Sequence, residues 1–512
     1  MRTKKGMRLL TVVIAVVWGG FHFPSAGVLA APQGVLKEAI HWSISGDYMD
    51  PASSHFISAS LPMYLFHDAL FKPMPEGLYT PSLAESYTFS PDAKVLEFKL
   101  RPGVKFHNGD TVTAEDVIFS FWRYRGAHAK TIQGRTEKVE AVNPALVRIH
   151  FKEPFPDLFE YLVPGISTIQ WVVPKKYVEQ VGDAGFKKHP IGCGPYKFVE
   201  FVPGVKLVAE AFEQYWRKVP NIKRIEFYQV PEPATRLAMV KRGEVDIATL
   251  MQGVFYEDVK KDPALRLVTS QSSTTWFVFM TAQWDPKSPW SDIRVRKAAS
   301  LAIDRKTLVD IHMPGCNPSG SMALEGDPDG VFFPADPYDP AQAKKLLAEA
   351  GFPKGFEGGK FYPYESGYWA YGEQIATYWK AVGINVETVL LDRPAWLATR
   401  DGGKMKGGIL INPEIHPTIG GRLMDLWGRG FSYGNYPEIQ ALWEQYRKEL
   451  SPKARKELIT RIQHMIHDKA LYLPLTPANS PAAFGSRVKG NPYRIQPLLW
   501  FTAPPEDIEL EK

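Results

Sequence analysis

The sequence is poor in the motifs by which enzymes are usually recognised. Its 512 residues contain neither the H-E-x-x-H pattern of zinc peptidases nor the P-loop of nucleotide-hydrolysing enzymes. The run Gly192-Cys193-Gly194 begins like a dinucleotide-binding loop, but Pro195 follows it and the third glycine is missing. These absences argue against zinc peptidases, nucleotide hydrolases and dinucleotide-dependent enzymes.

Cysteine is scarce, because only Cys193 and Cys316 occur and they lie far apart in the sequence. In an oxidising compartment the two thiols could pair, but two positions alone do not decide a connectivity. A nucleophilic role for Cys193 would need a lowered thiol pKa and a neighbouring base, and the sequence shows neither. The state of the two cysteines therefore stays open.

Apolar runs long enough to cross a membrane are absent after residue 30. The N-terminus has four basic residues before an apolar run at 9–18, and small residues at 28–31 surround a candidate cut after Ala30. This order predicts a cleavable signal peptide over 1–30, with an uncleaved anchor as the alternative. Because no cysteine lies near the cut, we expect a periplasmic protein that is not a lipoprotein.

The chain has little excess of either charge. Its formal net charge is +6, and removing the predicted signal peptide takes away four basic and no acidic residues, which leaves +2. A nearly neutral balance gives no reason to expect a nucleic acid as partner. The shares of hydrophobic residues, 45%, and of charged residues, 23%, are ordinary for a globular protein long enough for two or three cores.

The character of the sequence changes near residues 280–290, and no repeat of about 20–50 residues occurs. The earlier part predicts strands and short helices at 39–45, 61–72, 147–151, 154–162, 233–246 and 245–248. The later part predicts helices at 295–309, 340–350, 372–382, 437–450 and 452–468, with strands at 359–362, 386–391 and 408–411. Alternation of helices and strands predicts an α/β lobe after a first lobe of mixed strands.

The segment FKLRPGVKFHNGDTVTAEDVIFSFW, Phe98–Trp122, has the densest local pattern. Alternating apolar residues predict strands at 98–101 and 104–107, each followed by a turn at Pro102-Gly103 or Asn108-Gly109.

A helix is predicted to follow these turns. Thr113 would cap it, with Asp116 completing a capping box. Ile118, Phe121 and Trp122 would form its apolar face.

Phe98–Trp122 closely resembles the signature of the family 5 extracellular solute-binding proteins, the receptors of peptide, nickel and opine ABC importers. Other stretches resemble the same family, and together they cover nearly the whole chain after residue 30. They are DPA at 50–52, PSLAESY at 81–87, GCGPYKF at 192–198, RGEVDIA at 242–248, DIRVRKAASLAIDR at 292–305, AKKLLAEAGF at 343–352 and YLPL at 472–475.

The resemblance implies an α/β, bilobed periplasmic-binding-protein fold of type II, in the large cluster that has an extra subdomain in lobe I. Lobe I would comprise 31–283, with the extra subdomain at about 67–189. Lobe II would comprise 284–480, and 481–512 would return to lobe I. Two crossover segments between the lobes would act as hinges.

The resemblance also places a ligand site between the lobes. Ser45 and Gly46 lie in a stretch that resembles the strand edge on which peptide-binding relatives place their ligand backbone. Aromatic side chains near the expected cleft are candidates to line it. They are Tyr64, Tyr364, Trp369, Trp427 and Tyr433, and packing in the core is the competing interpretation for each.

The stretch 410–433 departs from the peptide-binding pattern. Many peptide-binding members have an Asp there that holds the α-ammonium of the peptide, whereas this chain offers Glu414 or Asp425 away from the motif position. A buried ammonium without a carboxylate partner costs several kcal/mol. Arg422 and Arg429 could instead face an anionic ligand, or could be surface arginines.

Two further polar clusters have structural interpretations that we favour. His464 and His467 are three residues apart on a predicted helix but lack a third metal ligand, so we expect no metal site. Arg294 and Arg296 belong to the RVR stretch, which is structural by family resemblance.

Together these features predict the substrate-binding component of an ABC importer. It would capture a peptide-like or other small polar solute by hinge closure and present it to the membrane subunits of a permease. We expect a monomer without catalytic activity, cofactor or nucleic-acid partner. The alternatives are a secreted hydrolase with an unrecognised site and a periplasmic chaperone that holds peptides.

Overall fold

The computed structural model describes residues 31–53, 59–126, 128–162, 167–364, 368–428, 434, 436–490 and 504–511. The predicted signal peptide at 1–30 and the candidates Arg429 and Tyr433 lie outside the described residues. Among the residues that are described, no helix is both long and apolar enough to cross a bilayer.

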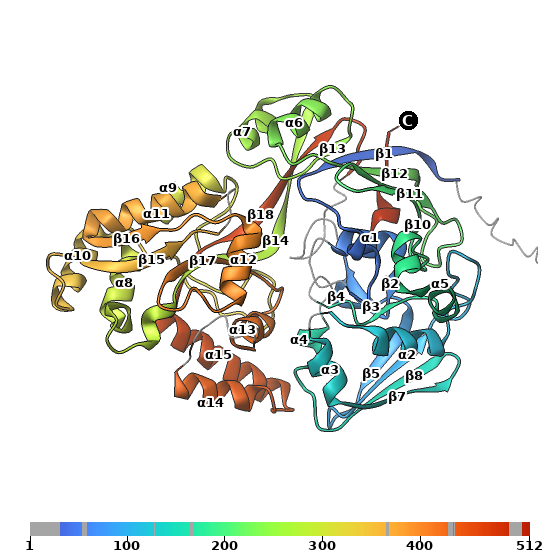
Figure 1. The fold of residues 1–512 in the computed structure, drawn as a ribbon, viewed down its shortest axis with the longest axis horizontal. Helices are drawn as coiled ribbons and strands as arrows, with labels where there is room; N and C mark the ends of the chain where they lie inside the picture. Colours follow the sequence, from blue (N-terminus) through green and yellow to red (C-terminus); the bar gives the residue numbers. More distant parts are fainter. Residues whose placement is uncertain are drawn as a thin grey trace, which may run out of the picture. The chain divides into compact units, whose positions relative to one another are not determined.

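A mixed sheet of ten strands organises the chain (Figure 1). In spatial order its strands are β10 (Tyr196–Val202), β11 (Lys206–Ala211), β12 (Ile222–Gln229), β1 (Gln33–Ile40), β13 (Ile247–Ala248), β18 (Tyr472–Gly485), β14 (Leu265–Met280), β17 (Ile409–Ile415), β15 (Phe356–Tyr362) and β16 (Ile384–Thr388). The parallel neighbours are β12-β1-β13, beyond which β11 and β10 pair antiparallel, and β17-β15-β16 at the other end. The central pairs are antiparallel.

The two longest strands, β14 and β18, connect the two ends of this sheet. They pair along almost their whole lengths, from Leu265 opposite Gly485 to Phe279 opposite Tyr472. One end of the pair adjoins β13, whereas the other lies beside β17 (Figure 1). The register shifts between Gln271 and Thr275, which marks the place where the pair leaves one end of the sheet for the other.

Smaller sheets fill the part of the chain between α1 (Ser60–Phe66) and β10. A four-stranded sheet has the order β5 (Ala84–Phe89), β6 (Val95–Leu100), β8 (Leu146–Phe151) and β7 (Thr136–Asn143). Two short pairs join β2 (Asp68–Ala69) to β9 (Trp171–Val172) and β3 (Phe71–Met74) to β4 (Gly77–Pro81).

The helices follow the predicted division of the chain. Before β14 they are α1, α2 (Ala114–Arg123), α3 (Ala129–Arg135), α4 (Leu158–Tyr161), α5 (Lys175–Lys188), α6 (Pro233–Lys241) and α7 (Val254–Lys261). After it they are α8 (Ile293–Leu301), α9 (Arg305–His312), α10 (Pro340–Glu349), α11 (Trp369–Val382), α12 (Arg393–Asp401), α13 (Ile419–Gly428), α14 (Pro437–Tyr446) and α15 (Pro452–Asp468). The predicted helices at 340–350 and 452–468 are confirmed.

The Phe98–Trp122 segment largely forms the predicted elements. β6 ends at Leu100, and Gly103 and Gly109 adopt the positive φ angles of +73° and +91° that their turns require. The capping box before α2 is present, because the Asp116 carboxylate accepts from the backbone N–H of Thr113 at 2.9 Å.

Two details of that segment were predicted wrongly. The stretch 104–107 forms no strand and contributes only the bridge between Lys105 and Thr111. Trp122 is 44% exposed and not part of the apolar face of α2, which buries Val117 and Phe121 instead. The error at Trp122 arises because residues three and four apart share a helix face only approximately, and packing against β7 and β9 selects the buried side.

Other predicted ranges also need correction, three of them at the level of whole elements. The strand predicted at 39–45 ends at Ile40 in β1, and the helix predicted at 61–72 stops at Phe66. All seven residues of α1 are buried, so α1 is not the amphipathic helix that the sequence predicted. The helix predicted at 295–309 is two helices, because Asp304 caps the second by accepting from Thr307 N at 3.0 Å.

Removal of the capping hydroxyl in Thr113→Ala should lower the free energy of unfolding by about 1 kcal/mol. Urea denaturation monitored by circular dichroism measures the loss. Thr111→Ala is the matched control, since its exposed hydroxyl only accepts from the Lys105 ammonium, and it should change stability by less than about 0.5 kcal/mol. Equal losses in the two variants would show that the box does not stabilise α2.

Candidate functional site

The first candidate segment follows β1 and contains Ser45 and Gly46. Ser45 caps the short 3-10 helix Gly46–Met49, its hydroxyl accepting from Asp47 N at 3.3 Å. Both candidates are half-buried, so they are accessible at the surface. The predicted strand edge is replaced here by a helical turn, because the serine side chain competes with strand hydrogen bonding.

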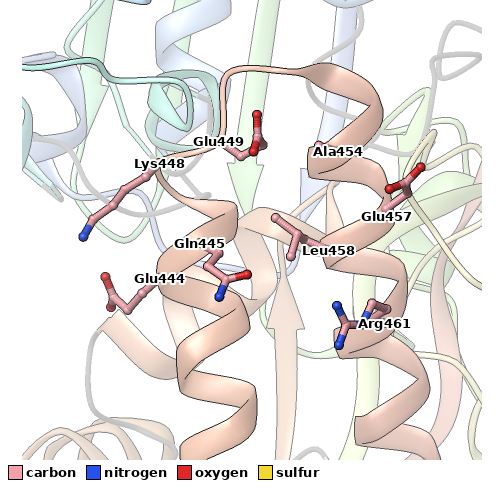
Figure 2. Close-up of a pocket in the computed structure, with 8 residues that line it drawn as sticks. All are labelled: Glu444, Gln445, Lys448, Glu449, Ala454, Glu457, Leu458 and Arg461. Atoms are coloured by element: carbon pink, nitrogen blue, oxygen red, sulfur yellow. The ribbon is translucent and has the colours of Figure 1, made fainter.

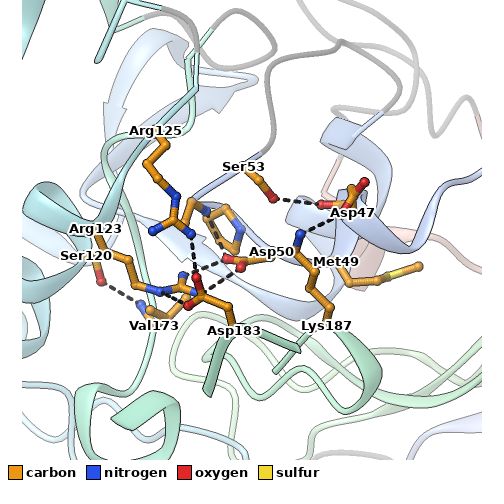
Figure 3. A network of polar contacts seen from close by, with 12 residues as sticks. Asp47, Met49, Asp50, Ser53, Ser120, Arg123, Arg125, Val173, Asp183 and Lys187 are labelled. Atoms are coloured by element: carbon orange, nitrogen blue, oxygen red, sulfur yellow. Dashed lines mark hydrogen bonds and ion pairs between the residues drawn. The ribbon is translucent and has the colours of Figure 1, made fainter. Parts of the chain in front are cut away.

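A buried ion-pair network anchors this segment to α2 and α5 (Figure 3). Arg123 makes two 2.7 Å hydrogen bonds to the Asp50 carboxylate, which is completely buried, and a 2.8 Å contact with Asp183. Arg125 also binds Asp183, at 2.6 Å, and Lys187 binds Asp47 at the same distance. The bidentate geometry fixes both position and orientation, so the DPA stretch acts as the fixed end of the Ser45–Gly46 turn.

Of the aromatic candidates, Tyr64 and Tyr364 are placed in packed surroundings. Tyr64 is 1% exposed, its hydroxyl donates to the Pro73 carbonyl at 3.2 Å, and its ring contacts Trp171. Tyr364 is 8% exposed and packs edge-on against Trp396 with ring centroids 4.8 Å apart.

The tryptophan candidates keep partial exposure. The indole N–H of Trp369 donates to the Leu391 carbonyl at 3.1 Å, and that of Trp427 donates to the Tyr472 hydroxyl at 3.2 Å. Trp427 also packs edge-on against Trp443. The structure therefore does not gather the four described aromatic candidates around one point.

The structure does bring Glu414, Arg422 and Asp425 into one buried region at the end of β17 and along α13. Arg422 is completely buried and donates to the backbone carbonyl of Glu414 at 3.2 Å. Burial lowers the pKa of Arg422 to about 10, partly offset by the Glu414 carboxylate. Asp425 lies 3.4 Å from the imidazole of His128, which comes from the start of α3. Each of the two carboxylates thus already has a basic neighbour.

Sequence reasoning missed a group of residues from α4, from α14 and from the turn between β17 and α13. The Glu160 carboxyl accepts from the hydroxyls of Thr418 and Tyr446, the latter at 3.2 Å. His416 Nε2 lies 3.0 Å from the backbone carbonyl of Glu160. Burial raises the pKa of Glu160 to about 7 and lowers that of His416 to about 4. We call Glu160, His416, Thr418 and Tyr446 the carboxyl ring.

Two adjacent glycines at the start of α13 make this approach possible. A Cβ at Gly421 would stand 1.8 Å from the His416 ring, and one at Gly420 would stand 2.6 Å from a carboxyl oxygen of Glu160. A larger residue at Gly421 would therefore displace the His416 imidazole, and one at Gly420 would displace the Glu160 carboxyl. The Gly-Gly pair was the signal in the sequence that could have indicated the site.

A second contact between the same elements flanks the carboxyl ring. Arg447, just after α14, contacts the Asp157 carboxylate at 3.1 Å and the Tyr161 hydroxyl at 3.3 Å. Asp157 is 3% exposed and precedes α4. Residues 157–161 thus contact the part of the chain after β17 in three ways. These are the Glu160 carboxyl, the Glu160 backbone carbonyl and the Asp157–Arg447 ion pair.

The remaining arginine and histidine residues that the sequence singled out make structural contacts. Arg296 is buried and donates to the carbonyls of Trp290 and Lys469 at 2.7 Å, which supports the structural interpretation of RVR. His467 stacks on Phe333 with centroids 3.9 Å apart. Among the described residues, no cluster of three or more His, Cys, Asp or Glu could hold a metal.

The two cysteines are both free thiols in the structure. Cys193 is buried and burial raises its thiol pKa well above the usual value, while the pKa of Cys316 is raised to about 11. A raised pKa disfavours the thiolate, so neither thiol is an activated nucleophile.

A surface groove of about 530 Å³ lies between α14 and α15 (Figure 2). Charges of both signs line it, from Glu444, Lys448, Glu449, Glu457 and Arg461. It is open to solvent and contains none of the predicted ligand residues. Its mixed charge and its position on one helical pair do not favour a specific anion or cation.

A G-x-S-x-G pentapeptide at 430–434 matches the pattern of a hydrolase nucleophile elbow. In such enzymes the nucleophile stands on a sharp turn between a strand and a helix. Here the flanking elements are the helices α13, which ends at Gly428, and α14, which begins at Pro437. The last described element before the pentapeptide is thus a helix, not the strand that an elbow requires.

The family model of the bacterial extracellular solute-binding proteins, family 5 (middle region), matches residues 79–409, which is more than half of the chain. The chain belongs to this family. The resemblance carried by Phe98–Trp122 is thereby confirmed, and the protein is a solute-binding protein. Members of the family are solute receptors, so neither the hydrolase nor the chaperone alternative gains support.

Individual relatives and a solved structure agree with this assignment. The heme-binding protein A of Haemophilus influenzae is 25% identical over 461 residues, covering 80% of this chain and 81% of the relative. The glutathione-binding protein GsiB of Pectobacterium atrosepticum is 28% identical over 340 residues, or 65% of each protein, just under two thirds of the relative's length.

The solved structure is that of the ABC transporter substrate-binding protein CtaP from Listeria monocytogenes. It superposes with a TM-score of 0.79 at 21% identity, covering 94% of this chain and 99% of that chain. This likeness confirms the bilobed, mixed α/β periplasmic-binding-protein fold.

The network in Figure 3 predicts a strongly asymmetric response to two similar substitutions. Asp50→Asn removes the charge that neutralises the nearly buried Arg123 guanidinium, and should cost about 3–5 kcal/mol of unfolding free energy. Asp183→Asn changes a carboxylate that is 47% exposed, and should cost less than about 1 kcal/mol. Urea denaturation of both variants measures the difference. Losses of similar size would contradict the assignment of Asp50 as the anchor.

Proposed function

We propose that this protein binds a peptide-like or other small polar solute between its two lobes and delivers it to the membrane subunits of an ABC permease. The observation that carries the proposal is the shared β14–β18 pair in a chain of the solute-binding family. In the described part of the chain only β14 and β18 join the two ends of the main sheet, so small torsions at their register shift can change the distance between the lobes.

The lobes in this proposal have the boundaries that the sequence suggested. Lobe I comprises 31–283 with an extra subdomain at about 67–189, lobe II comprises 284–480, and 481–512 returns to lobe I. The return of 481–512 to lobe I is supported by Glu506, because its carboxylate binds Arg217, shortly before β12, at 2.8 Å. We propose that the hinge lies at the register shift of β14 near Gln271, slightly before the boundary at 283.

The solute site is proposed to include Ser45, Gly46, Trp369, Trp427 and the β17–α13 region. Glu414 and Asp425 lie there beside Arg422 and His128 respectively. An α-ammonium would therefore meet carboxylates that already have basic neighbours, which weakens its binding relative to an isolated carboxylate. A solute that relies on amide and hydroxyl groups fits this arrangement better than one anchored by a free amino terminus.

The remaining parts of the proposal follow from the role of a receptor. The protein performs no reaction, needs no cofactor and acts as a monomer in the periplasm after removal of residues 1–30. Solute contacts to both lobes exist only in the closed form, so binding shifts the population towards that form. The permease then distinguishes loaded from empty receptors by lobe separation.

Isothermal titration calorimetry of the mature chain against peptide, opine and oligosaccharide panels tests the proposal. One panel member should bind saturably with one site per chain. Glu414→Gln should weaken that binding tenfold or more, since a charged hydrogen-bond partner is lost. Glu357→Gln, an exposed carboxylate on β15, is the control and should bind as the wild type does.

Two outcomes of that titration would contradict the proposal. Weak binding of many unrelated extended peptides together with suppression of aggregation would indicate a chaperone. Chemical turnover of a panel member, detected by chromatography after incubation, would indicate an enzyme.

A further inference from the structure

The carboxyl ring joins two parts of the chain that belong to different proposed lobes. Glu160 comes from α4 in the extra subdomain, whereas His416, Thr418 and Tyr446 come from lobe II. These contacts, with the neighbouring Arg447–Asp157 pair, exist only while the two parts are together. The ring is therefore a contact of the closed arrangement, and its chemistry influences how stable that arrangement is.

The hydrogen bonds of His416 fix its protonation state. Its Nδ1 accepts from the backbone N–H of Thr418 at 3.2 Å, so that nitrogen carries no proton. Its Nε2 therefore carries the ring proton and donates to the Glu160 carbonyl at 3.0 Å. Burial keeps the imidazole neutral, in agreement with its lowered pKa.

The Thr418 hydroxyl lies between two acceptors. It contacts Glu160 Oε2 on one side and His416 Nδ1 at 3.2 Å on the other. The Nδ1 atom is already satisfied by the Thr418 N–H, and the hydroxyl itself accepts from Gly421 N at 3.2 Å. The donors to the carboxyl among the described residues are thus the two neutral hydroxyls of Thr418 and Tyr446. An ionised Glu160 is buried here without a cationic partner in the described part of the chain, whereas protonation removes the buried charge and lets the carboxyl donate to the Thr418 oxygen.

The surrounding charges leave the carboxyl without a direct cationic partner among the described residues. Arg455 approaches from α15, but it donates to the Tyr446 carbonyl at 2.8 Å and lies over the ring of Tyr446. Asp327 is a second acidic group nearby, accepting from Ile419 N at 2.5 Å, and its charge disfavours ionisation of Glu160.

The other elements that pack around Glu160 supply no opposing charge at the carboxyl. Tyr79 on β4 donates to the Phe159 carbonyl at 3.2 Å. Arg422 on α13 is directed to the Glu414 carbonyl, and the His128–Asp425 pair lies further along that helix.

We propose that Glu160 is a proton-dependent positioning residue for solute binding: its protonated carboxyl closes the hydrogen-bonded ring with Thr418, His416 and Tyr446, so that acidic conditions favour the closed receptor. This inference rests on the proposed function, because it assigns a regulation to lobe closure. It does not require that the solute touch Glu160.

The sign of the pH dependence follows from the two states of Glu160. In the open form the carboxyl is solvated and titrates near its ordinary pKa of 4.5, whereas burial in the ring raises that pKa to about 7. The extra stability of the closed form is therefore complete below about pH 4.5 and is lost as the pH rises through about 7. Between pH 5 and 7.5 the solute Kd should increase by up to roughly fifty-fold.

Small-angle X-ray scattering of the solute-free mature chain tests the ring without any ligand. The radius of gyration of the wild type should be smaller at pH 5 than at pH 8. Glu160→Gln should stay compact at both values, since an amide can donate to Thr418 and accept from Tyr446 without a charge. Glu153→Gln is the matched control, 66% exposed beside Arg135, and should keep the wild-type pH response.

Two scattering results would overturn the inference: a wild-type radius that is independent of pH, or a pH response that persists in Glu160→Gln. Circular dichroism confirms that each variant is folded. Should Glu160→Gln fail to fold, calorimetric titration of wild-type protein in two buffers of different ionisation enthalpy replaces it. Solute binding near pH 6 should then take up close to one proton, and an uptake of zero contradicts the ring.

The same experiments separate failure of the ring from failure of the proposed function. If the ring is wrong but the receptor function is right, a solute binds with an affinity that does not change between pH 5 and 7.5. If the function is wrong, no panel solute binds at any pH, while the compaction at pH 5 still occurs in the wild type and not in Glu160→Ala.

Discussion

The pairing of β14 with β18 is the constraint on which the rest of the structure depends. Each strand contributes to both ends of the main sheet. The hydrogen bonds between β14 and β18 therefore connect the strands on the β13 side to those on the β17 side. The register shift near Gln271 interrupts this pairing where the pair changes neighbours from β13 to β17. Two strands with a local irregularity can transmit a bend without loss of the flanking sheet, which suits a receptor that opens and closes.

Polar contacts away from these strands decide how the moving parts meet. The Asp50–Arg123 pair is internal to one part and fixes the turn that contains Ser45 and Gly46 (Figure 3). The carboxyl ring, in contrast, joins Glu160 to residues that follow β17, and in our proposal these contacts form only in the closed receptor. A buried pair inside one part, such as Asp50–Arg123, makes that part rigid. Contacts between two parts, such as the carboxyl ring, contribute to the free-energy difference between the proposed open and closed forms.

The sequence predicted much of the fold where local physics and tertiary packing agree. The capping box of Thr113 and Asp116, the glycine turns and the long helix α15 need only neighbouring residues, and all were found as expected. Prediction failed at α1, which ends at Phe66 and has every residue buried, where an amphipathic helix to Lys72 was predicted. It failed also at Trp122, whose exposure is decided by packing against distant strands.

The candidate site was less predictable than the fold. Glu414, Arg422 and Asp425 are close in sequence, so their proximity in β17 and α13 could be anticipated. The carboxyl ring could not, because Glu160 is separated from Thr418 by more than half of the chain and its chemistry arises from burial. The neighbouring sequence does not indicate that Glu160 is buried. The one local signal is the pair Gly420-Gly421, because a larger residue at either position would clash with the carboxyl ring.

Native mass spectrometry of the gently purified mature chain, after incubation with an extract of small metabolites and peptides, tests solute capture most directly. The account predicts a mass shift that corresponds to one small polar molecule per chain, which is lost on denaturation. A spectrum with only the bare chain, or with chains that hold long polypeptides of varied mass, would contradict it.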